Sequence, residues 1–327
     1  MIKTILITGG CGFIGSHFIN LALKRNFNLI NLDPLLIGSN KKFTTIRTNK
    51  YKFYKVSTTN KSKVREILET DKPNAIINFG AETHVDRSII DPKKFIKNNV
   101  LGTFNLADEF KNYVIRNGLS NYKFINISTD EVYGSTNNKS FKETDMLYPN
   151  SPYSSSKAAA DLVLRSFEKT YNFKSIIVRP SNNFGPRQYH EKLIPLSIKR
   201  LNEGKKIPVY GNGKNKREWL YVEDCVKTIL NLLKSKLYSG TFNIGSNKTI
   251  SNIDLINLIC DLYFKKKYSK QSLIKNYINF VEDRPGHDFM YKLNHKKIKK
   301  HGLLENSNFE NNLRKTVNYY KKIWEKE

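Results

Sequence analysis

A tyrosine and a lysine spaced four residues apart could take a proton from an alcohol. On a helix, Tyr153 and Lys157 would lie on one face, one turn apart. A cation beside a phenol favours the phenolate, so we expect Lys157 to lower the pKa of Tyr153 and make it a base for alcohol oxidation. Alone, this pair is a weak signal, because exposed helical turns also contain it.

A second segment supplies two carboxylates that alcohol oxidation does not need. Thr129, Asp130 and Glu131 follow an apolar run at residues 124–127. Elimination of water requires one group that removes a carbon-bound proton and another that protonates the departing hydroxyl. The pair therefore predicts a dehydration. A solvated strand end or a helix N-terminus is the structural alternative.

A glycine-rich segment near the N-terminus predicts a dinucleotide site. Gly9, Gly12 and Gly15 follow an apolar run at 5–7 and open an amphipathic run at 16–24. Strand, glycine loop and helix in this order let the backbone approach a pyrophosphate. The phosphates then face the unpaired N–H groups at the helix N-terminus.

An acidic residue follows the second expected strand. Asp33 comes 18 residues after Gly15, at the end of the run 28–32. A carboxylate at this position would hold the adenosine ribose diol and repel a 2′-phosphate, which favours NAD over NADP. A turn residue before Pro34 is the alternative interpretation.

Alternating apolar and helical patterns predict an α/β fold with two lobes. Expected strands at 51–56, 75–79, 124–128 and 175–178 are separated by expected helices at 61–69, 91–117 and 153–171. This pattern predicts a Rossmann-type doubly wound parallel sheet in an NAD-binding domain of residues 1–179. Turns dominate afterwards, so we expect a smaller substrate-binding lobe in 180–327, with 222–245 returning to the first domain.

Composition limits the remaining classes of protein. The chain has 327 residues and 39% apolar content, enough for two such lobes. Cys11, Cys225 and Cys260 have neither metal-ligand spacing nor a disulfide pattern, so we expect no metal and a reducing compartment, the cytoplasm. We find no signal segment and no apolar run long enough to span a membrane.

A formal net charge of +27 raises the question of nucleic-acid binding. Lysines are spread along the whole chain, and no helix-turn-helix, zinc finger or RNP-type strand is present. We therefore expect no nucleic-acid partner. The positive field would instead attract an anionic substrate that carries a diphosphate.

The chain resembles the extended short-chain dehydrogenase/reductases, and among them the nucleotide-sugar 4,6-dehydratases. The resemblance runs from about residue 5 to 288 in ordered blocks: GGCGFIG at 9–15, AETHVDRS at 81–88, STDEVYG at 128–134, SPYSSSK at 151–157, SNNFGP at 181–186, EKLIP at 191–195, REWLYVED at 217–224 and DRPGHD at 283–288. So many blocks in one order make the match specific. Related sugar epimerases share the nucleotide half but lack the Asp–Glu pair.

The resemblance implies an NAD-dependent lyase that acts on a nucleotide-diphosphate glucose, dTDP-glucose or UDP-glucose, in three steps. Tyr153 would take the proton of the 4-hydroxyl while a hydride passes to NAD, with Lys157 supporting the phenolate and Thr129 binding the 4-oxygen. Glu131 would then remove the C5 proton and Asp130 would protonate the leaving C6 hydroxyl. The hydride would return to C6, giving a 4-keto-6-deoxy sugar.

The resemblance also implies two sets of binding residues. Those expected along NAD are Gly9, Gly12, Phe13, Ile14, Gly15, Asp33, Ala81, Asn98, Tyr153, Lys157 and Asn183. Those expected along the sugar nucleotide are Thr83, Thr129, Asn182, Lys192, Leu193, Pro208, Val209, Tyr210, Arg217, Asn252, Arg284 and His287. In the second set, Arg217 is the expected diphosphate clamp, because its planar guanidinium matches phosphate oxygens.

Several alternatives stay open at the level of sequence. A nucleotide-sugar epimerase of the same family is the second enzymatic hypothesis, and a non-catalytic NAD-sensing or scaffold protein is a third. The sequence does not distinguish a thymidine from a uridine nucleotide. The resemblance further implies a homodimer packed through the helix that precedes Asn117 and the helix that carries Tyr153 and Lys157.

Overall fold

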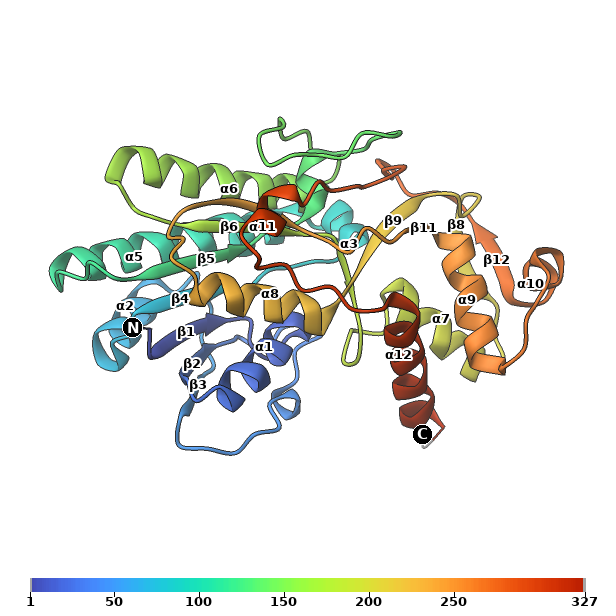
Figure 1. Cartoon of the computed structure of the whole chain (residues 1–327), viewed down its shortest axis with the longest axis horizontal. Coiled ribbons are helices and arrows are strands. Elements are labelled where there is room, and N and C mark those ends of the chain that lie inside the picture. The colour runs from blue at the N-terminus through green and yellow to red at the C-terminus, as the bar shows by residue number, and fades with distance from the viewer. Residues whose placement is uncertain (1, 326–327) are drawn as a thin grey trace.

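A seven-stranded parallel sheet organises the first lobe of this computed structural model, which describes residues 2–325 (Figure 1). Its order is β10-β6-β5-β4-β1-β2-β3. The strands are β1 (Thr4–Thr8), β2 (Asn28–Leu32), β3 (Tyr51–Tyr54), β4 (Ala75–Asn78), β5 (Lys123–Ile127), β6 (Ile176–Pro180) and β10 (Gly240–Ile244). The order reverses between β1 and β4, and ligands of such sheets bind beyond the carboxyl ends of the strands at this point.

Helices cover both faces of the sheet because its strands are apolar on both sides. Ile5 and Ile7 of β1 pack into one core with α1 (Phe13–Lys24) and α8 (Val222–Lys234), while Leu6 faces the opposite core. That second core contains α2 (Lys61–Asp71), α5 (Gly102–Arg116) and α6 (Pro152–Tyr171). Continuous apolar runs are typical of such two-sided burial. The predicted Rossmann-type doubly wound sheet is confirmed.

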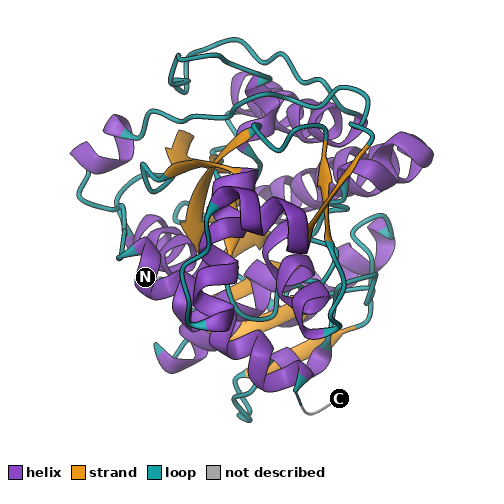
Figure 2. Cartoon of the chain, turned by 90° about the vertical axis from the view of Figure 1, so that its right-hand side faces the viewer, coloured by secondary structure: helices purple, strands orange, loops and turns teal. Residues whose placement is uncertain are grey.

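A smaller lobe with its own apolar core lies at the other end of the molecule (Figures 1 and 2). It has a three-stranded sheet of β7 (Asn182–Phe184), β9 (Lys216–Tyr221) and β11 (Thr249–Ser251), and a parallel pair of β8 (Ile207–Tyr210) and β12 (Ile278–Val281). Its helices are α7 (Leu193–Asn202), α9 (Asn252–Phe264), α10 (Lys270–Tyr277) and α12 (Phe309–Trp324).

The chain crosses between the lobes more than once. After β9 it re-enters the first lobe as α8, which packs against α1, and then as β10, which pairs with β6 from Gly240↔Ile176 onward. Residues 222–244 thus lie in the first lobe, although they follow part of the second in sequence. The division of the chain at residue 179 stays a prediction.

The short helices and turns that connect the larger elements differ most from those predicted from the sequence. The single helix expected at 91–117 consists of α4 (Pro92–Phe95), a π-helix η2 (Ile96–Leu101) and α5. The remaining short elements are α3 (Val85–Ile90), α11 (Lys296–Lys300), and the 3₁₀ turns η1 (Lys41–Phe43) and η3 (Asp130–Tyr133). No helix in the described part of the chain is long and apolar enough to cross a membrane.

Candidate active site

A cleft runs from the carboxyl ends of β1 and β4 to the second lobe. It consists of three adjoining pockets, which we name by a residue of each: the Asp33 pocket, the Tyr153 pocket and the Tyr210 pocket. Glu191 lines all three, so they form one continuous space.

The glycine loop is fitted closely against the end of β4. Gly9 has a φ of +65°, and a Cβ there would lie 2.7 Å from the Cα of Gly80. A Cβ on Gly15 would lie 2.4 Å from the carbonyl oxygen of Gly9. Gly12 precedes α1 and provides no side-chain cap, so the first N–H groups of this helix are free to bind an anion. This arrangement fits a dinucleotide pyrophosphate.

Asp33 is buried at the wall of the Asp33 pocket. Its Oδ2 accepts a hydrogen bond from the Cys11 backbone N–H (2.9 Å) and its Oδ1 accepts one from that of Leu35 (2.8 Å). Burial raises the pKa of this carboxyl. Asp33 therefore anchors the glycine loop at Cys11 and the segment after β2 at Leu35. Its role as a ribose ligand stays a prediction. Burial and Asp33 raise the pKa of the Cys11 thiol to about 11, as suits a packing residue.

The 3₁₀ turn η3 presents the adjacent carboxylates to the Tyr153 pocket. Thr129 caps this turn: its Oγ1 accepts from the Glu131 N–H (3.3 Å), and its hydroxyl donates to Asp130 Oδ1 (3.2 Å). Asp130 is only 2% exposed, and its Oδ2 has no protein partner. Burial and the neighbouring Glu131 hold the pKa of Asp130 well above its usual range. Asp130 is thus suited to act as a proton donor.

Glu131 differs from its neighbour in its charged surroundings. Burial raises the pKa of its carboxyl, but Arg284 and Arg217 lower it. Two carboxylates whose environments separate their pKa values are typical of an acid–base pair.

Helix α6 brings the predicted tyrosine and lysine into the same pocket. A capping box of Ser151 and Ser154 fixes the start of the helix, with Pro152 in its first turn. Tyr153 follows at once and lines the pocket with Lys157 one turn later. Lys157 Nζ donates to the carbonyl oxygen of Ile127 at the end of β5 (2.6 Å), and burial lowers its pKa to about 8.

The expected effect of Lys157 on Tyr153 is wrong for this structure. Burial raises the pKa of the Tyr153 phenol, and the charges of Glu131 and Asp130 raise it further. Only the hydroxyl of Thr129 acts in the opposite direction. Lys157 is directed instead to the backbone of β5. Burial and the two carboxylates therefore favour the neutral form of the phenol, and a positive charge beside it would favour the phenolate.

All residues predicted from the sequence line the cleft. In the Asp33 pocket these are Asp33, Ala81 and Asn98. In the Tyr153 pocket they are Gly9, Gly12, Phe13, Ile14, Gly15, Thr83, Thr129, Asp130, Glu131, Tyr153 and Lys157. In the Tyr210 pocket they are Asn182, Asn183, Lys192, Leu193, Pro208, Val209, Tyr210, Arg217, Asn252, Arg284 and His287. The structure thus brings together every predicted residue, while their individual roles stay predictions.

Arg217 has more partners than a simple phosphate clamp. It is 6% exposed, and its guanidinium donates to the carbonyl oxygens of Lys216 (2.8 Å) and Asp288 (3.0 Å). It also packs over the ring of Tyr291, 4.4 Å from the centroid. Arg217 therefore holds the segment around residue 288 while it borders the Tyr210 pocket, so few of its donors remain for a ligand.

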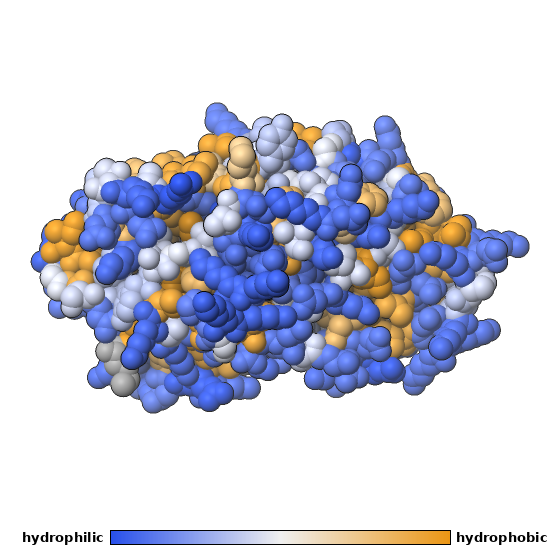
Figure 3. Space-filling view, turned by 45° about the horizontal axis from the view of Figure 1, so that its top comes forward, coloured by the Kyte–Doolittle hydropathy of each residue, from blue (hydrophilic) through white to orange (hydrophobic). Residues whose placement is uncertain are grey.

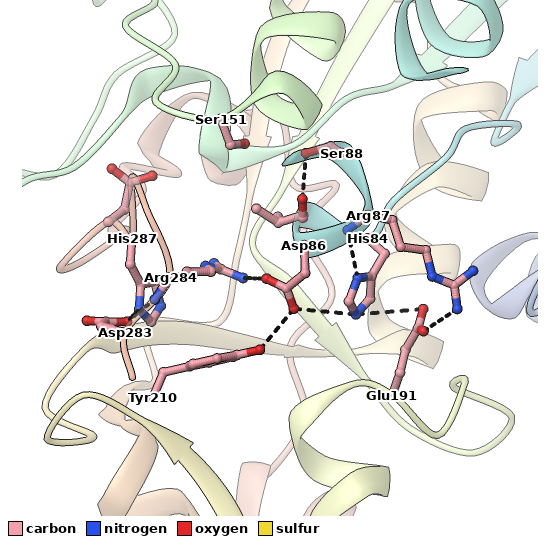
Figure 4. A network of polar contacts seen from close by, with 12 residues as sticks. His84, Asp86, Arg87, Ser88, Ser151, Glu191, Tyr210, Asp283, Arg284 and His287 are labelled. Carbon is pink, nitrogen blue, oxygen red and sulfur yellow. Dashed lines mark hydrogen bonds and ion pairs between the residues drawn. The ribbon is translucent and has the colours of Figure 1, made fainter. Parts of the chain in front are cut away.

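Sequence reasoning missed a polar network that joins the two lobes across the Tyr210 pocket (Figure 4). Asp86 of α3 accepts from the Tyr210 hydroxyl (3.2 Å) and pairs with Arg284 Nη1 (3.4 Å). Beside it, Glu191 pairs with Arg87 (2.6 Å) and lies 3.8 Å from His84 Nε2. The available signal was the sequence blocks: His84, Asp86 and Arg87 lie in the block 81–88, and Glu191 lies in the block 191–195.

Buried polar atoms without protein partners are concentrated at the cleft. They include the side-chain oxygens of Asn182, Asn183, Gln188 and Asn252, and Arg284 Nε. Buried polar groups in proteins are otherwise satisfied, so these atoms are expected to bind a polar ligand. Among residues 2–325, no group of His, Cys, Asp and Glu side chains could hold a metal ion.

Comparisons with known proteins agree with this site. A family model described as GDP-mannose 4,6 dehydratase matches residues 6–316. The dTDP-glucose 4,6-dehydratase of Neisseria gonorrhoeae is 38% identical, with 97% of this chain and 95% of the relative covered. That of Escherichia coli is 37% identical, with 98% and 95% covered.

Solved structures show the same likeness. The dTDP-glucose 4,6-dehydratase of Streptomyces venezuelae, crystallised with NAD and dTDP, has a TM-score of 0.89 at 33% identity, with 98% of this chain and 97% of that chain covered. That of Bacillus anthracis, with NAD, has a TM-score of 0.87 at 36% identity, with 99% and 98% covered. A UDP-glucose 4-epimerase from Thermus thermophilus shares the fold at 24% identity. The motifs, the cleft and these full-length matches together confirm the family predicted from the sequence: the chain belongs to the GDP-mannose 4,6-dehydratase family.

Proposed function

We propose that this protein is an NAD-dependent dTDP-glucose 4,6-dehydratase, which forms a 4-keto-6-deoxy sugar nucleotide. One observation carries the proposal. Asp130, a buried carboxyl whose pKa is held well above its usual range, lies next to a second carboxyl, Glu131, in the pocket that contains Tyr153. Such a pair suits the elimination of water, in which one group removes a proton from a carbon and another protonates the hydroxyl that leaves the adjacent carbon.

The first step is assigned to Tyr153 and Thr129. When bound, NAD would supply the hydride acceptor for C4, a positive charge in the pocket and the hydride that C6 later receives. Tyr153 takes the proton of the 4-hydroxyl, and the hydroxyl of Thr129 steadies the 4-oxygen. Lys157, which lines the same pocket, stays charged below a pH of about 8. The glycine loop and the N-terminus of α1 hold the pyrophosphate.

The second step is assigned to the carboxylates. The new 4-ketone acidifies the C5 proton, which Glu131 removes. Asp130 gives its proton to the C6 hydroxyl, which leaves as water. The charges of Arg284 and Arg217 favour the ionised form of Glu131 against the effect of burial on its pKa, whereas burial and Glu131 hold the pKa of Asp130 well above its usual range.

The choice of the thymidine nucleotide rests on the relatives named dTDP-glucose 4,6-dehydratases. The Tyr210 pocket is the proposed site of this nucleotide, with Pro208, Val209 and Tyr210 along the base and Lys192 and Arg217 near the diphosphate. The second candidate, an epimerase, has the shared fold in its favour, but it would leave Asp130 without a task.

A homodimer is proposed through α5 and α6. Exposed apolar side chains on this side are Leu101, Phe104, Ile115, Leu162 and Tyr171. Figure 3 shows apolar residues interrupting the hydrophilic surface over the end of the molecule that carries these helices. Replacing Leu162 with Glu should give a monomer by light scattering after gel filtration. For the compartment we propose the cytoplasm, since the three buried cysteines are free thiols.

The function is tested by incubating the purified protein in parallel with dTDP-glucose and UDP-glucose. We expect a 4-keto-6-deoxy product from dTDP-glucose and slower turnover of UDP-glucose. A C4 epimer as the product would favour the epimerase. The absence of any keto product from either nucleotide would refute the dehydratase assignment.

A further inference from the structure

A buried network lies behind the catalytic segments, away from the cleft. Its centre is Asp161 of α6, which is 2% exposed. Oδ2 of Asp161 accepts from Ser128 Oγ (2.9 Å) and from Arg179 Nε on β6 (3.0 Å). Asn126 Nδ2 lies 3.5 Å from Oδ1. One carboxylate therefore joins α6 to the ends of β5 and β6.

The network continues to the turn that carries the two acidic residues. Arg179 Nη1 donates to the Tyr133 hydroxyl (2.7 Å), which donates to Asn243 Oδ1 on β10 (2.8 Å). Tyr133 is the last residue of η3, and its ring stacks on Phe141 at a centroid distance of 5.0 Å. The position of η3, and hence of Asp130, is thus tied to Asp161 through Arg179.

The same carboxylate lies one helical turn after Lys157. Its negative charge favours the ammonium form of Lys157, against the effect of burial. The charged groups that act on Asp161 are Arg179 on β6 and Lys157 on α6, and the charged group that acts on Lys157 is Asp161. Asp161 is therefore the group on α6 whose negative charge stabilises the ammonium of Lys157.

A buried ion pair of this kind is weak evidence for stability, because the desolvation of both charges offsets their attraction. A positioning role explains better why it is present. We propose that Asp161 is a positioning residue for dehydration, which fixes the turn of Asp130 and Glu131 through Arg179 and Tyr133. This inference rests on the proposed function for its kinetic part only.

The test compares Asp161→Asn with the parent enzyme. We expect kcat for the keto product to fall about ten- to hundredfold, while KM for the nucleotide sugar stays within threefold, because Asp161 does not line the cleft. The alkaline limb of the kcat profile should move to lower pH by about one pH unit, since an opposite charge that favours the ammonium of Lys157 is lost. Amide hydrogen exchange of residues 129–134 should quicken at least tenfold.

A matched control is Glu109→Gln. Glu109 is fully buried and holds Arg65 through two hydrogen bonds (2.8 and 2.9 Å), outside the cleft. This variant should lose thermal stability with kcat and the pH profile unchanged. If Asp161→Asn behaves in the same way, with kcat within threefold of the parent and an unmoved alkaline limb, the proposal is overturned.

Two further variants keep the test decisive if Asp161→Asn does not fold. The double variant Asp161→Asn/Arg179→Gln removes both members of the buried ion pair and should fold, but with the same loss of kcat. Tyr133→Phe removes the hydrogen bonds of the Tyr133 hydroxyl to Arg179 and Asn243 but leaves Asp161 in place, so kcat should fall at least fivefold with an unmoved alkaline limb. A Tyr133→Phe enzyme with parental kcat and parental exchange at 129–134 would refute the link. A parent enzyme that produces no keto sugar would refute the proposed function instead, and the exchange experiment would still decide the positioning of η3.

Discussion

Replacing Asp130 with Asn separates the acid step from every other task of the cleft. The amide has nearly the shape of the protonated carboxyl, and it can still accept the hydrogen bond from Thr129 (3.2 Å in the parent). It cannot release a proton to a leaving hydroxyl. Because Asp130 is buried and held in its acid form, the change replaces one neutral group by another. The variant should therefore fold, bind NAD and oxidise C4.

The magnitude follows from the task that is lost. General acid catalysis by a positioned side chain contributes about 10²- to 10⁴-fold, or about 2.7–5.4 kcal/mol of barrier. We expect kcat for the keto product to fall within this range. KM should change little, since Asp130 lines the Tyr153 pocket and not the Tyr210 pocket.

Asp130→Asn should lower kcat but raise thermal stability relative to the parent as the pH increases. The folded-state pKa of Asp130 is raised, so the folded protein binds more protons than the unfolded chain above the unfolded value of 3.8. The parent therefore loses stability as pH rises through the folded-state pKa, whereas Asp130→Asn does not. The melting temperature of the variant, relative to the parent, should increase between acidic and neutral pH.

The assay is a single turnover with excess enzyme, in which reduced nicotinamide and keto sugar are followed together. Asp130→Asn should accumulate reduced nicotinamide, because oxidation continues while elimination is blocked. A suitable control is Asp71→Asn, which removes a buried carboxylate that bonds the Tyr54 hydroxyl (2.8 Å) outside the cleft and should leave kcat unchanged. Asp130→Asn turnover within threefold of the parent would show that the acid is another group.

Four further predictions concern the same cleft. Glu131→Gln should retain NAD and block loss of water by about 10²-fold or more, measured by the exchange of the C5 proton with deuterated solvent, and near-parental exchange would contradict the assigned base. In steady state, reduced nicotinamide should not accumulate while keto product rises, and a stoichiometric increase would indicate an ordinary dehydrogenase. Arg217→Ala should raise KM for the nucleotide sugar about ten- to hundredfold, because a hydrogen bond to a charged group contributes about 1.5–3 kcal/mol. The same variant should lower the melting temperature, because the carbonyl oxygens near residue 288 lose their donor, and Arg217→Lys should restore little of the affinity. Unchanged sugar-nucleotide affinity in Arg217→Ala would show that the residue is structural only. Asp86→Asn should raise KM no more than about fivefold with kcat retained, since partly exposed ion pairs contribute at most about 1 kcal/mol, and a larger loss of kcat would place Asp86 in the chemistry.

The features that the sequence predicted best are those with a local pattern. The order of strand, glycine loop and helix identified the dinucleotide half, because the close fit of Gly9 and Gly15 tolerates no side chain. The spacing of Tyr153 and Lys157 placed both on one helix face. The apolar runs predicted a sheet buried on both sides. These inferences need only neighbours along the chain.

The features that it did not predict depend on contacts between distant segments. Asp86 meets Tyr210 and Arg284 only after the lobes are assembled, at sequence separations of more than a hundred residues. The raised pKa of Tyr153 arises from burial and from carboxylates on another element, which spacing along α6 does not reveal. The π-helix of residues 96–101 carries no sequence signal that we recognised, and it divides what the pattern presented as one helix.

The position of β10 has a consequence for how the protein is made. The edge of β6 that β10 will cover stays open until the ribosome has added roughly 60 more residues, which takes about 3–12 s at a synthesis rate of about 5–20 residues per second. An unpaired edge invites pairing with other chains. During this interval the nascent first lobe is an incomplete sheet, and its protection depends on chaperones or on the speed of translation. A fragment that stops at residue 179 would keep that edge open permanently and should aggregate, although it contains the whole glycine loop and Tyr153.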